Sequence, residues 1–452
     1  MNLQENHRQL FGDTPITKLF FRCTIPSIIS MASSSLYTIA DGIFVGRFIG
    51  AGALAAVNLV MPVIMISFAL SDMIAVGSSV QIAIGLGEQN HEKASRIFSF
   101  SCKMILAISV AVGLFAWFSA PFIVSFLGAD DKVASMAVAY MRVYALFAPF
   151  TMSFFAIDNY LRICGKVHYS MNVNIFSSVA NIFLDWLFIV KFRWGIGSAA
   201  LASCLCLAAG NMICMAPFIR KKLVLKFTKG RISLAQTGRI IANGSSEFFS
   251  NISSSLCMVM FNAVLMQLAG YMAVAAFSIV MYIDSVVKSI LFGMSDSLQP
   301  AISYNYGAAS LKRVFGLEKR AQAAGFLVSA AVMLWMLFGA DSIIGLFSQE
   351  GNTELLLMST NAMKLFSFSY LVSWCGIISS SFFTALSRPA ASLAVSFSQT
   401  LLLPVLFLLT LPKLWGLNGV WISSSFSGGF TVILILILMV GVIKSCRREI
   451  QS

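Results

Sequence analysis

Long apolar runs dominate this chain and leave little room for any fold other than a bundle of membrane-spanning helices. Twelve such runs are separated by short segments that carry charges, Gly and Pro. A helix needs about 20 apolar residues to cross the hydrocarbon core of a bilayer. Only 11% of the 452 residues are charged, against about 25% in soluble domains, so this composition cannot supply a water-soluble surface.

The runs divide into two sets of six, and each run predicts one helix. We predict helices over 19–46, 53–84, 97–127, 133–160, 167–190 and 196–219, and over 240–268, 271–303, 314–346, 355–385, 390–411 and 417–443. The predicted domains are an N-terminal six-helix lobe over residues 1–219, a basic cytoplasmic linker over 220–239 and a C-terminal six-helix lobe over 240–452.

Basic residues are distributed unevenly between the two ends of these predicted helices. With the N-terminus in the cytoplasm, 22 of the 31 Lys and Arg residues fall in inner segments, 5 in outer loops and 4 within helices. The outer ones are Arg47, Lys132, Lys191, Arg193 and Lys413. This bias follows the positive-inside rule and predicts that both termini are cytoplasmic. It also accounts for the net charge of +13, so we expect no nucleic-acid partner.

The two halves repeat each other at a fixed offset in sequence number. Residues 33–36 and 253–256 both read SSSL, and the Trp-Gly pair at Trp194 recurs at Trp415 after a one-residue slip. Because each copy has an even number of helices, both copies enter the membrane from the same side. The predicted fold is therefore an all-α membrane protein of twelve transmembrane helices. Its two six-helix lobes are related by a pseudo-two-fold axis along the membrane normal, with a cleft between them.

Three predicted helices carry a polar stripe at intervals of i, i+4, i+7 and i+11, which places each stripe on one helix face. The stripes are Ser30, Ser34, Tyr37 and Asp41; Asn174, Ser178, Asn181 and Asp185; and Asn243, Glu247, Ser250 and Ser254. Polar side chains at membrane depth usually face a cavity or another helix, although small ones equally suit close helix packing. The side chains predicted to line a substrate cavity are Ser34, Tyr37, Asn174, Ser178 and Glu247.

Two acids on these stripes have similar predicted depths. Asp41 and Asp185 each precede the outer end of their helix by about five residues, which places both about 8 Å into the membrane. With the Asn181 amide they could bind a hard cation through oxygen ligands or share a proton. The second half has no such pair, because the offset matches Asp41 with Phe261.

The second half contains a polar stripe with one acid and, within another predicted helix, a pair of opposite charges. Glu247 has no acidic partner on its stripe, so it suits an organic cation, or it forms an ion pair with Lys364 or Arg142. Asp284 and Lys288 are four residues apart on one predicted helix, a spacing that favours a structural ion pair.

Missing motifs narrow the class of function. The chain has no Walker A sequence and no His and Cys residues at metal-ligand spacing, so we expect no cofactor and an ion gradient as the energy source. We predict a cation-coupled antiporter and not an enzyme. An intramembrane enzyme that uses His168 and Asp158 is the alternative from another class.

Three segments resemble the MATE (multidrug and toxic compound extrusion) family. Residues 36–63, LYTIADGIFVGRFIGAGALAAVNLVMPV, resemble its first-helix signature, and residues 297–309, SLQPAISYNYGAA, resemble its eighth-helix motif. Residues 382–389, FFTALSRP, resemble a further motif in which Ser387 replaces the usual Gly. The resemblance extends over nearly the whole chain and is nearest to the bacterial MepA-like multidrug efflux branch.

The resemblance implies a twelve-helix, two-lobe exporter of mostly cationic drugs, in exchange for Na⁺ or H⁺, that spans the bacterial plasma membrane. It implies that Asp41, Asn181 and Asp185 bind the coupling cation, Na⁺ included, and that Ser203 contributes a hydroxyl where Thr is typical. Glu247 corresponds to an acid that some members use. We expect a monomer. A flippase for a lipid-linked sugar or another amphipathic lipid is the alternative function within the superfamily.

Overall fold

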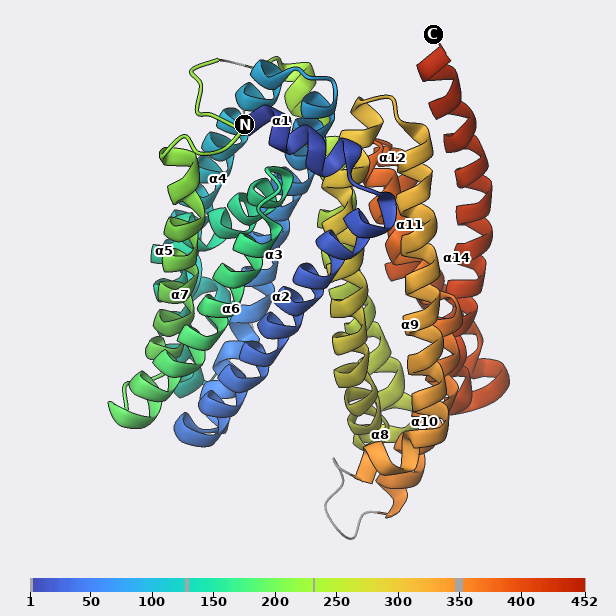
Figure 1. Ribbon diagram of the computed structural model, residues 1–452. Coiled ribbons are helices and arrows are strands. Elements are labelled where there is room, and N and C mark those ends of the chain that lie inside the picture. The colour runs from blue at the N-terminus through green and yellow to red at the C-terminus, as the bar shows by residue number, and fades with distance from the viewer. Residues whose placement is uncertain (1–2, 127–129, 231, 346–352, 452) are drawn as a thin grey trace. The chain divides into compact units, whose positions relative to one another are not determined.

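The computed structural model describes residues 3–126, 130–230, 232–345 and 353–451, and its regular structure there is entirely helical (Figure 1). These residues form two compact units. The first unit contains Met1–Pro15 and Phe21–Gly244, and the second contains Ile16–Phe20 and Ser245–Ser452.

The elements follow one another along the chain with short connections. Those of the first half are α1 (Leu3–Arg8), η1 (Gln9–Asp13), α2 (Ile16–Phe44), η2 (Val45–Ile49), α3 (Ala51–Gly87), α4 (His91–Phe126), α5 (Asp131–Ile163), α6 (Val167–Asp185), η3 (Trp186–Lys191) and α7 (Gly197–Ile219). Those of the second half are α8 (Leu234–Gly307), α9 (Leu311–Gly345), α10 (Thr353–Ser367), η4 (Phe368–Leu371), α11 (Ser373–Ala385), α12 (Pro389–Phe397), η5 (Ser398–Leu402), α13 (Leu403–Thr410) and α14 (Pro412–Gln451).

Most of these helices can cross a membrane. In the described part of the chain, ten are long and apolar enough, or eleven when the bent pair Glu354–Leu371 and Ser373–Ala385 is one broken span. The 74 residues of α8 would extend about 110 Å, but the backbone of Ala269 and Gly270 is non-helical and divides it in two. With both parts of α8 counted, the described residues contain the twelve spans that hydropathy predicts.

The observed helices extend beyond many of the predicted ranges. For example, α4 begins at His91, where the sequence predicted a start at residue 97. Hydropathy detects only the part of a helix in the hydrocarbon, whereas polar end turns lie at the membrane surface and remain helical. The N-terminal helix α1 was not predicted for the same reason, because its sequence LQENHR is polar.

The two halves of the chain also share backbone conformations at turns between helices. Three pairs of residues have positive φ angles, from 55° to 118°, at matching positions: Gly50 and Gly270, Gln89 and Ala309, Gly165 and Ser387. The first two pairs share the offset of the sequence repeat, and the third departs from it by only two positions. The family motif has glycine at position 387, and the φ of 56° at Ser387 explains that preference, because a Cβ atom disfavours the left-handed conformation.

The first unit is organised around α5, which packs on α3, α4 and α7. The connection between the halves is tied to this unit, because the backbone N–H of Thr228 donates to Ser99 Oγ on α4 (2.8 Å). The start of α8 approaches α3 closely enough that a Cβ on Gly244 would lie 1.7 Å from the Met73 carbonyl oxygen. Small residues permit such close contact between membrane helices.

The second unit has three consecutive serines on α11 that bind to three different helices. Gln322 Nε2 on α9 donates to Ser379 Oγ (3.0 Å), and Ser380 Oγ lies 3.0 Å from Ser392 Oγ on α12. Gln299 Nε2 on α8 donates to Ser381 Oγ (2.8 Å). Successive residues on a helix point about 100° apart, so one tripeptide connects α11 to α8, α9 and α12.

Candidate cation site

Two acids of the first unit meet at the ends of their helices. Asp41 on α2 and Asp185 on α6 have carboxyl groups within hydrogen-bonding reach of each other. Asp185 is fully buried and Asp41 is half-buried. A π-helical segment follows each acid: η3 begins directly after Asp185, and η2 begins four residues after Asp41. The segments η2 and η3 contact each other, and π-helical turns are frequent at functional sites.

Contact between one fully buried and one half-buried carboxyl group limits the charges that the pair can carry. Two adjacent carboxylates repel each other strongly in a poorly hydrated environment, so the pair requires a shared proton or a cation between them. The Oδ1 atoms of both Asp41 and Asp185 are buried and receive no hydrogen bond within the described part of the chain. These oxygens are therefore available to a proton or to an oxygen-seeking cation.

Asn181 and Ser203 extend the set of oxygen atoms around the pair. Asn181 lies one helical turn before Asp185, and Ser203 belongs to α7. In the amide orientation that satisfies both ends of Asn181, Nδ2 donates to Asp185 Oδ2 (3.2 Å) and Oδ1 accepts from Ser203 Oγ (3.0 Å). The structure thus brings together the four residues that the family resemblance assigns to a coupling cation.

Two tyrosines lie close to the acids. Tyr37 on α2, which the sequence placed in a cavity, and Tyr140 on α5 both lie close enough to interact electrostatically with Asp41 and Asp185. Tyr140 is 6% exposed and belongs to the apolar cluster that also contains Val45 and Ile189. Sequence reasoning missed Tyr140, because no polar stripe accompanies it on α5.

Two of the other polar residues predicted for the cavity, Asn174 and Ser178, have hydrogen-bond partners within the first unit. Asn174 Nδ2 donates to Asp158 Oδ1 (3.1 Å) and to the Ser170 carbonyl oxygen (3.0 Å). Ser178 Oγ donates to the Asn174 carbonyl oxygen (2.9 Å). Ser34 is half-buried on α2. Asn174 therefore has a structural use in the bundle, and the cavity role of these three residues stays a prediction.

Asp158 is the centre of a buried network. It forms an ion pair with Arg162 (2.7 Å), and the Arg162 and Asp158 side chains are 8% and 7% exposed. Ser170 Oγ donates to Asp158 Oδ1 (2.5 Å), and Arg162 Nη1 donates to Ser27 Oγ on α2 (3.0 Å). A carboxylate that accepts from an arginine and a hydroxyl is a poor general base, and His168 is exposed. This arrangement favours a structural role for Asp158 over the enzymatic alternative.

Two ion pairs of the second unit join charges within that unit. Asp284 pairs with Lys288 (2.6 Å) and accepts a hydrogen bond from Tyr370 Oη (3.0 Å). Lys364 pairs with Asp341 (3.7 Å). Glu247 is half-buried on α8.

An aromatic stack occupies the position that the repeat matches with Asp41. Phe261 stacks on Phe277 with ring centroids 5.2 Å apart and an interplanar angle of 4°. Phe277 stacks in turn on Trp421, and all three side chains are buried. The second unit therefore has an apolar contact where the first has a carboxyl group.

Comparisons with known proteins give a consistent result. The MatE family model matches twice, at residues 26–187 and 248–409, so the second match is displaced from the first by nearly the offset predicted from the sequence. Proteins named "Multidrug export protein MepA" are similar over almost their whole length. The one from Staphylococcus haemolyticus (strain JCSC1435) is 24% identical over 91% of this chain and 90% of its own. The one from Staphylococcus aureus (strain MSSA476) is 24% identical over 92% of both chains.

Solved structures share the fold. A structure described as "Crystal structure of MATE in complex with MaL6" has a TM-score of 0.92 and 23% identity, over 98% of this chain and 99% of its own. Another, "Outward-facing conformation of a multidrug resistance MATE family transporter of the MOP superfamily", has a TM-score of 0.89 and 24% identity, over 98% of both chains. A third, from Pyrococcus furiosus, has a TM-score of 0.91 and 23% identity, over 98% of both chains, and its description reads "Reverse polarity of binding pocket suggests different function". The fold alone therefore does not identify the cargo.

Proposed function

We propose that this chain, which belongs to the MatE family of membrane transporters, is a secondary exporter of organic cations and drugs that exchanges them for Na⁺ or H⁺. The observation that carries the proposal is the contact between the carboxyl groups of Asp41 and Asp185. The names of the relatives support drug export, and the acidic site favours a cargo of positive charge.

The pair can act as a switch because its repulsion depends on occupancy. A proton or Na⁺ between Asp41 and Asp185 removes the repulsion between α2 and α6, and its release restores that repulsion. Asn181 and Ser203 orient the oxygens, while Tyr140 and the apolar residues around it exclude water and strengthen the electrostatic effect. Exchange follows if the drug favours the conformation that the coupling ion disfavours, or competes for the same carboxylates.

The first experiment removes the charge of each acid and keeps its shape. Asp41→Asn and Asp185→Asn are each expected to abolish ethidium efflux from loaded cells without loss of the protein from the membrane. Asp341→Asn is the matched control, because Asp341 is exposed and pairs only weakly with Lys364. Efflux at the wild-type rate from either site variant would refute the role of the pair.

A second experiment identifies the coupling ion and tests the cargo. Purified protein in proteoliposomes is given a pre-imposed Na⁺ gradient or pH gradient, and a cationic dye is then added. Collapse of one gradient identifies its ion as the coupling ion. If the dye affects neither gradient while a lipid-linked sugar changes leaflet, the flippase is the correct function. Epitope tags at the two ends test the predicted cytoplasmic termini.

A further inference from the structure

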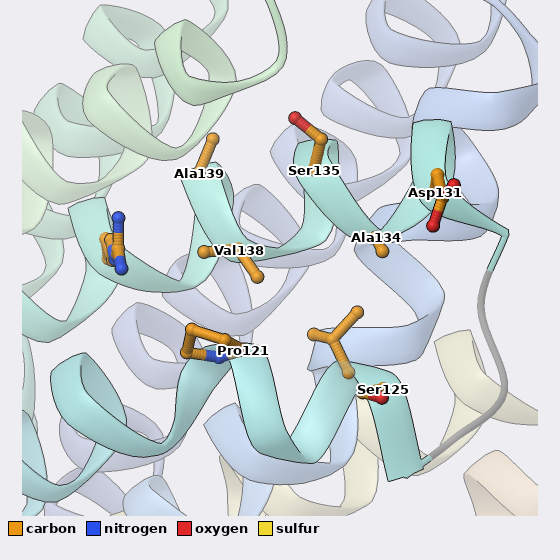
Figure 2. A pocket seen from close by; sticks show the side chains of 9 residues that line it. Pro121, Ser125, Asp131, Ala134, Ser135, Val138 and Ala139 are labelled. Carbon is orange, nitrogen blue, oxygen red and sulfur yellow. The ribbon is translucent and has the colours of Figure 1, made fainter.

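A hollow of about 540 Å³ lies between α4 and α5 in the first unit, apart from the acid pair. Figure 2 shows Pro121 and Ser125 of α4 on one side and Ala134, Ser135 and Val138 of α5 on the other, with Asp131 at one end. Arg142 also lines the hollow, eleven residues further along α5. The lining thus combines small and apolar side chains with one acidic group, Asp131, and one basic group, Arg142.

Arg142 has no acidic partner in the described part of the chain. Its side chain is exposed, and its guanidinium lies 5.7 Å from the centre of the Trp117 ring on α4. Asp131 is about 16 Å away along α5 by helical rise, too far to neutralise it directly. A charged side chain within a membrane span is costly unless it has a partner or reaches the surface.

The depth of Arg142 matches the region of lipid phosphates. With 33 residues, α5 is about 50 Å long, roughly 20 Å more than the hydrocarbon core. If the helix extends equally beyond both sides of the hydrocarbon core, about 10 Å of it lies outside the core at each end. The backbone of Arg142 then lies roughly 6 Å inside the boundary of the hydrocarbon core. Helical side chains tilt toward the N-terminus, and a long arginine side chain can carry its charge to the surface. The guanidinium thereby reaches the boundary near the N-terminal end of α5, predicted to be the outer one.

We propose that this hollow binds an anionic phospholipid of the phosphatidylglycerol type, with the lipid phosphate on Arg142. Arginine matches the charge and geometry of a phosphate group, and Trp117 holds the guanidinium from the other side. Ser125, Ser135 and Asp131 offer hydrogen-bond partners to the hydroxyl groups of a glycerol headgroup. The acyl chains continue inward from Trp117 along the exposed apolar face of α4, where Leu114 is 56% exposed and Val110 is 43% exposed.

The experiment compares lipids on the full-length purified protein after delipidation. Native mass spectrometry and thermal unfolding are measured with phosphatidylglycerol, phosphatidylethanolamine and phosphatidylcholine, and with glycerol phosphate as the free anion. Wild type is expected to retain phosphatidylglycerol and to unfold at a higher temperature in its presence. Arg142→Gln is expected to lower the affinity roughly tenfold or more, as for loss of a close charge pair.

Lys132→Gln is the matched control, because Lys132 is another exposed basic residue of α5 that does not line the hollow. Ser135→Leu fills the hollow and keeps Arg142, so it separates loss of space from loss of charge and remains informative if Arg142→Gln folds poorly. Equal binding by Arg142→Gln and Lys132→Gln would overturn the proposal. So would unchanged affinity in Ser135→Leu, equal retention of the zwitterionic lipids, or equal stabilisation by glycerol phosphate. The readout is lipid binding, so it does not depend on the transported substrate.

Discussion

The substitution Arg162→Met tests the buried network that ties α2, α5 and α6 together. Methionine keeps much of the apolar length of the arginine side chain and removes its charge. The change eliminates the 2.7 Å ion pair with Asp158 and the hydrogen bonds from Arg162 to Ser170 Oγ (3.2 Å) and Ser27 Oγ (3.0 Å). Asp158 then remains as a buried anion without a cation.

The expected cost follows from the stranded charge. Removing one partner of a buried ion pair costs about 3–5 kcal/mol. Asp158 retains the hydrogen bonds from Ser170 and Asn174, which favours the lower end, about 3 kcal/mol. For a folding unit of roughly 200 residues, this cost lowers the midpoint of thermal unfolding by about 6–12 °C. Adding Asp158→Asn removes the stranded anion, so the double variant is expected to recover about half of that loss.

The assay heats the purified protein in detergent and measures, at each temperature, the amount of protein that remains monodisperse. Arg96→Met is the matched control, because the Arg96–Glu92 pair is exposed and 3.7 Å apart, and such surface pairs contribute about 0–1 kcal/mol. If Arg162→Met lowers the midpoint no more than Arg96→Met does, or if Asp158→Asn gives no recovery, the reasoning about the buried network is wrong.

Two further predictions concern the ends of helices. Burial lowers the pKa of His7 from 6.5 to about 4, despite the contact of its Nε2 with the Ile163 carbonyl oxygen. The docked N-terminal segment therefore holds His7 neutral, whereas the undocked segment binds a proton below pH 6.5. Docking is expected to have its full stability above pH 6.5 and to lose about 3 kcal/mol as the pH falls to 4. Limited proteolysis of this segment at pH 7.5 and 5 checks this, and His7→Phe should remove the pH dependence. Ser387→Gly should relieve the strain of the left-handed backbone and increase the free energy of unfolding by about 0.5 kcal/mol, which raises the unfolding midpoint by about 1–2 °C. An equal rise in Ser387→Ala would show that backbone strain is not the cause.

The sequence predicts the helices well because hydropathy reports a local property. A segment such as 53–84 is apolar enough to span the membrane regardless of its neighbours, and it lies within α3. The common depth of Asp41 and Asp185 can also be predicted from the sequence, because equal distance from the helix ends implies equal depth in the membrane. Only the helix arrangement, which the family resemblance supplies, places their faces toward each other.

Other features depend on partners that are distant in the sequence. Nothing near Asn174 indicates that its amide binds Asp158, sixteen residues earlier on another helix. The π-helical turns η2 and η3 also have no recognisable sequence pattern, because they result from how the helix ends pack. Tyr140 is one more aromatic residue in an apolar helix until the fold places it beside the acids. Periodicity within one helix describes a face, but not what covers it.

The repeat shows which properties a duplicated membrane fold retains. Left-handed residues recur at matching turns, as at Gly50 and Gly270, because a helix reversal limits the backbone conformation whatever the side chains do. Small buried polar groups also recur, as at Ser109 and Ser329, but the buried acids do not. Glu318 is 6% exposed and accepts a hydrogen bond from Gln322, whereas the repeat matches it with Phe98, a buried ring stacked on Phe218. Acid and aromatic residues have thus exchanged places in both directions, as Asp41 and Phe261 also show. An aromatic ring can fill the space of a buried carboxyl group and needs no countercharge, so each copy could lose its acid while its turns stayed fixed. The repeat therefore predicts the positions of helices, and a polar site must be established in each unit from its own side chains.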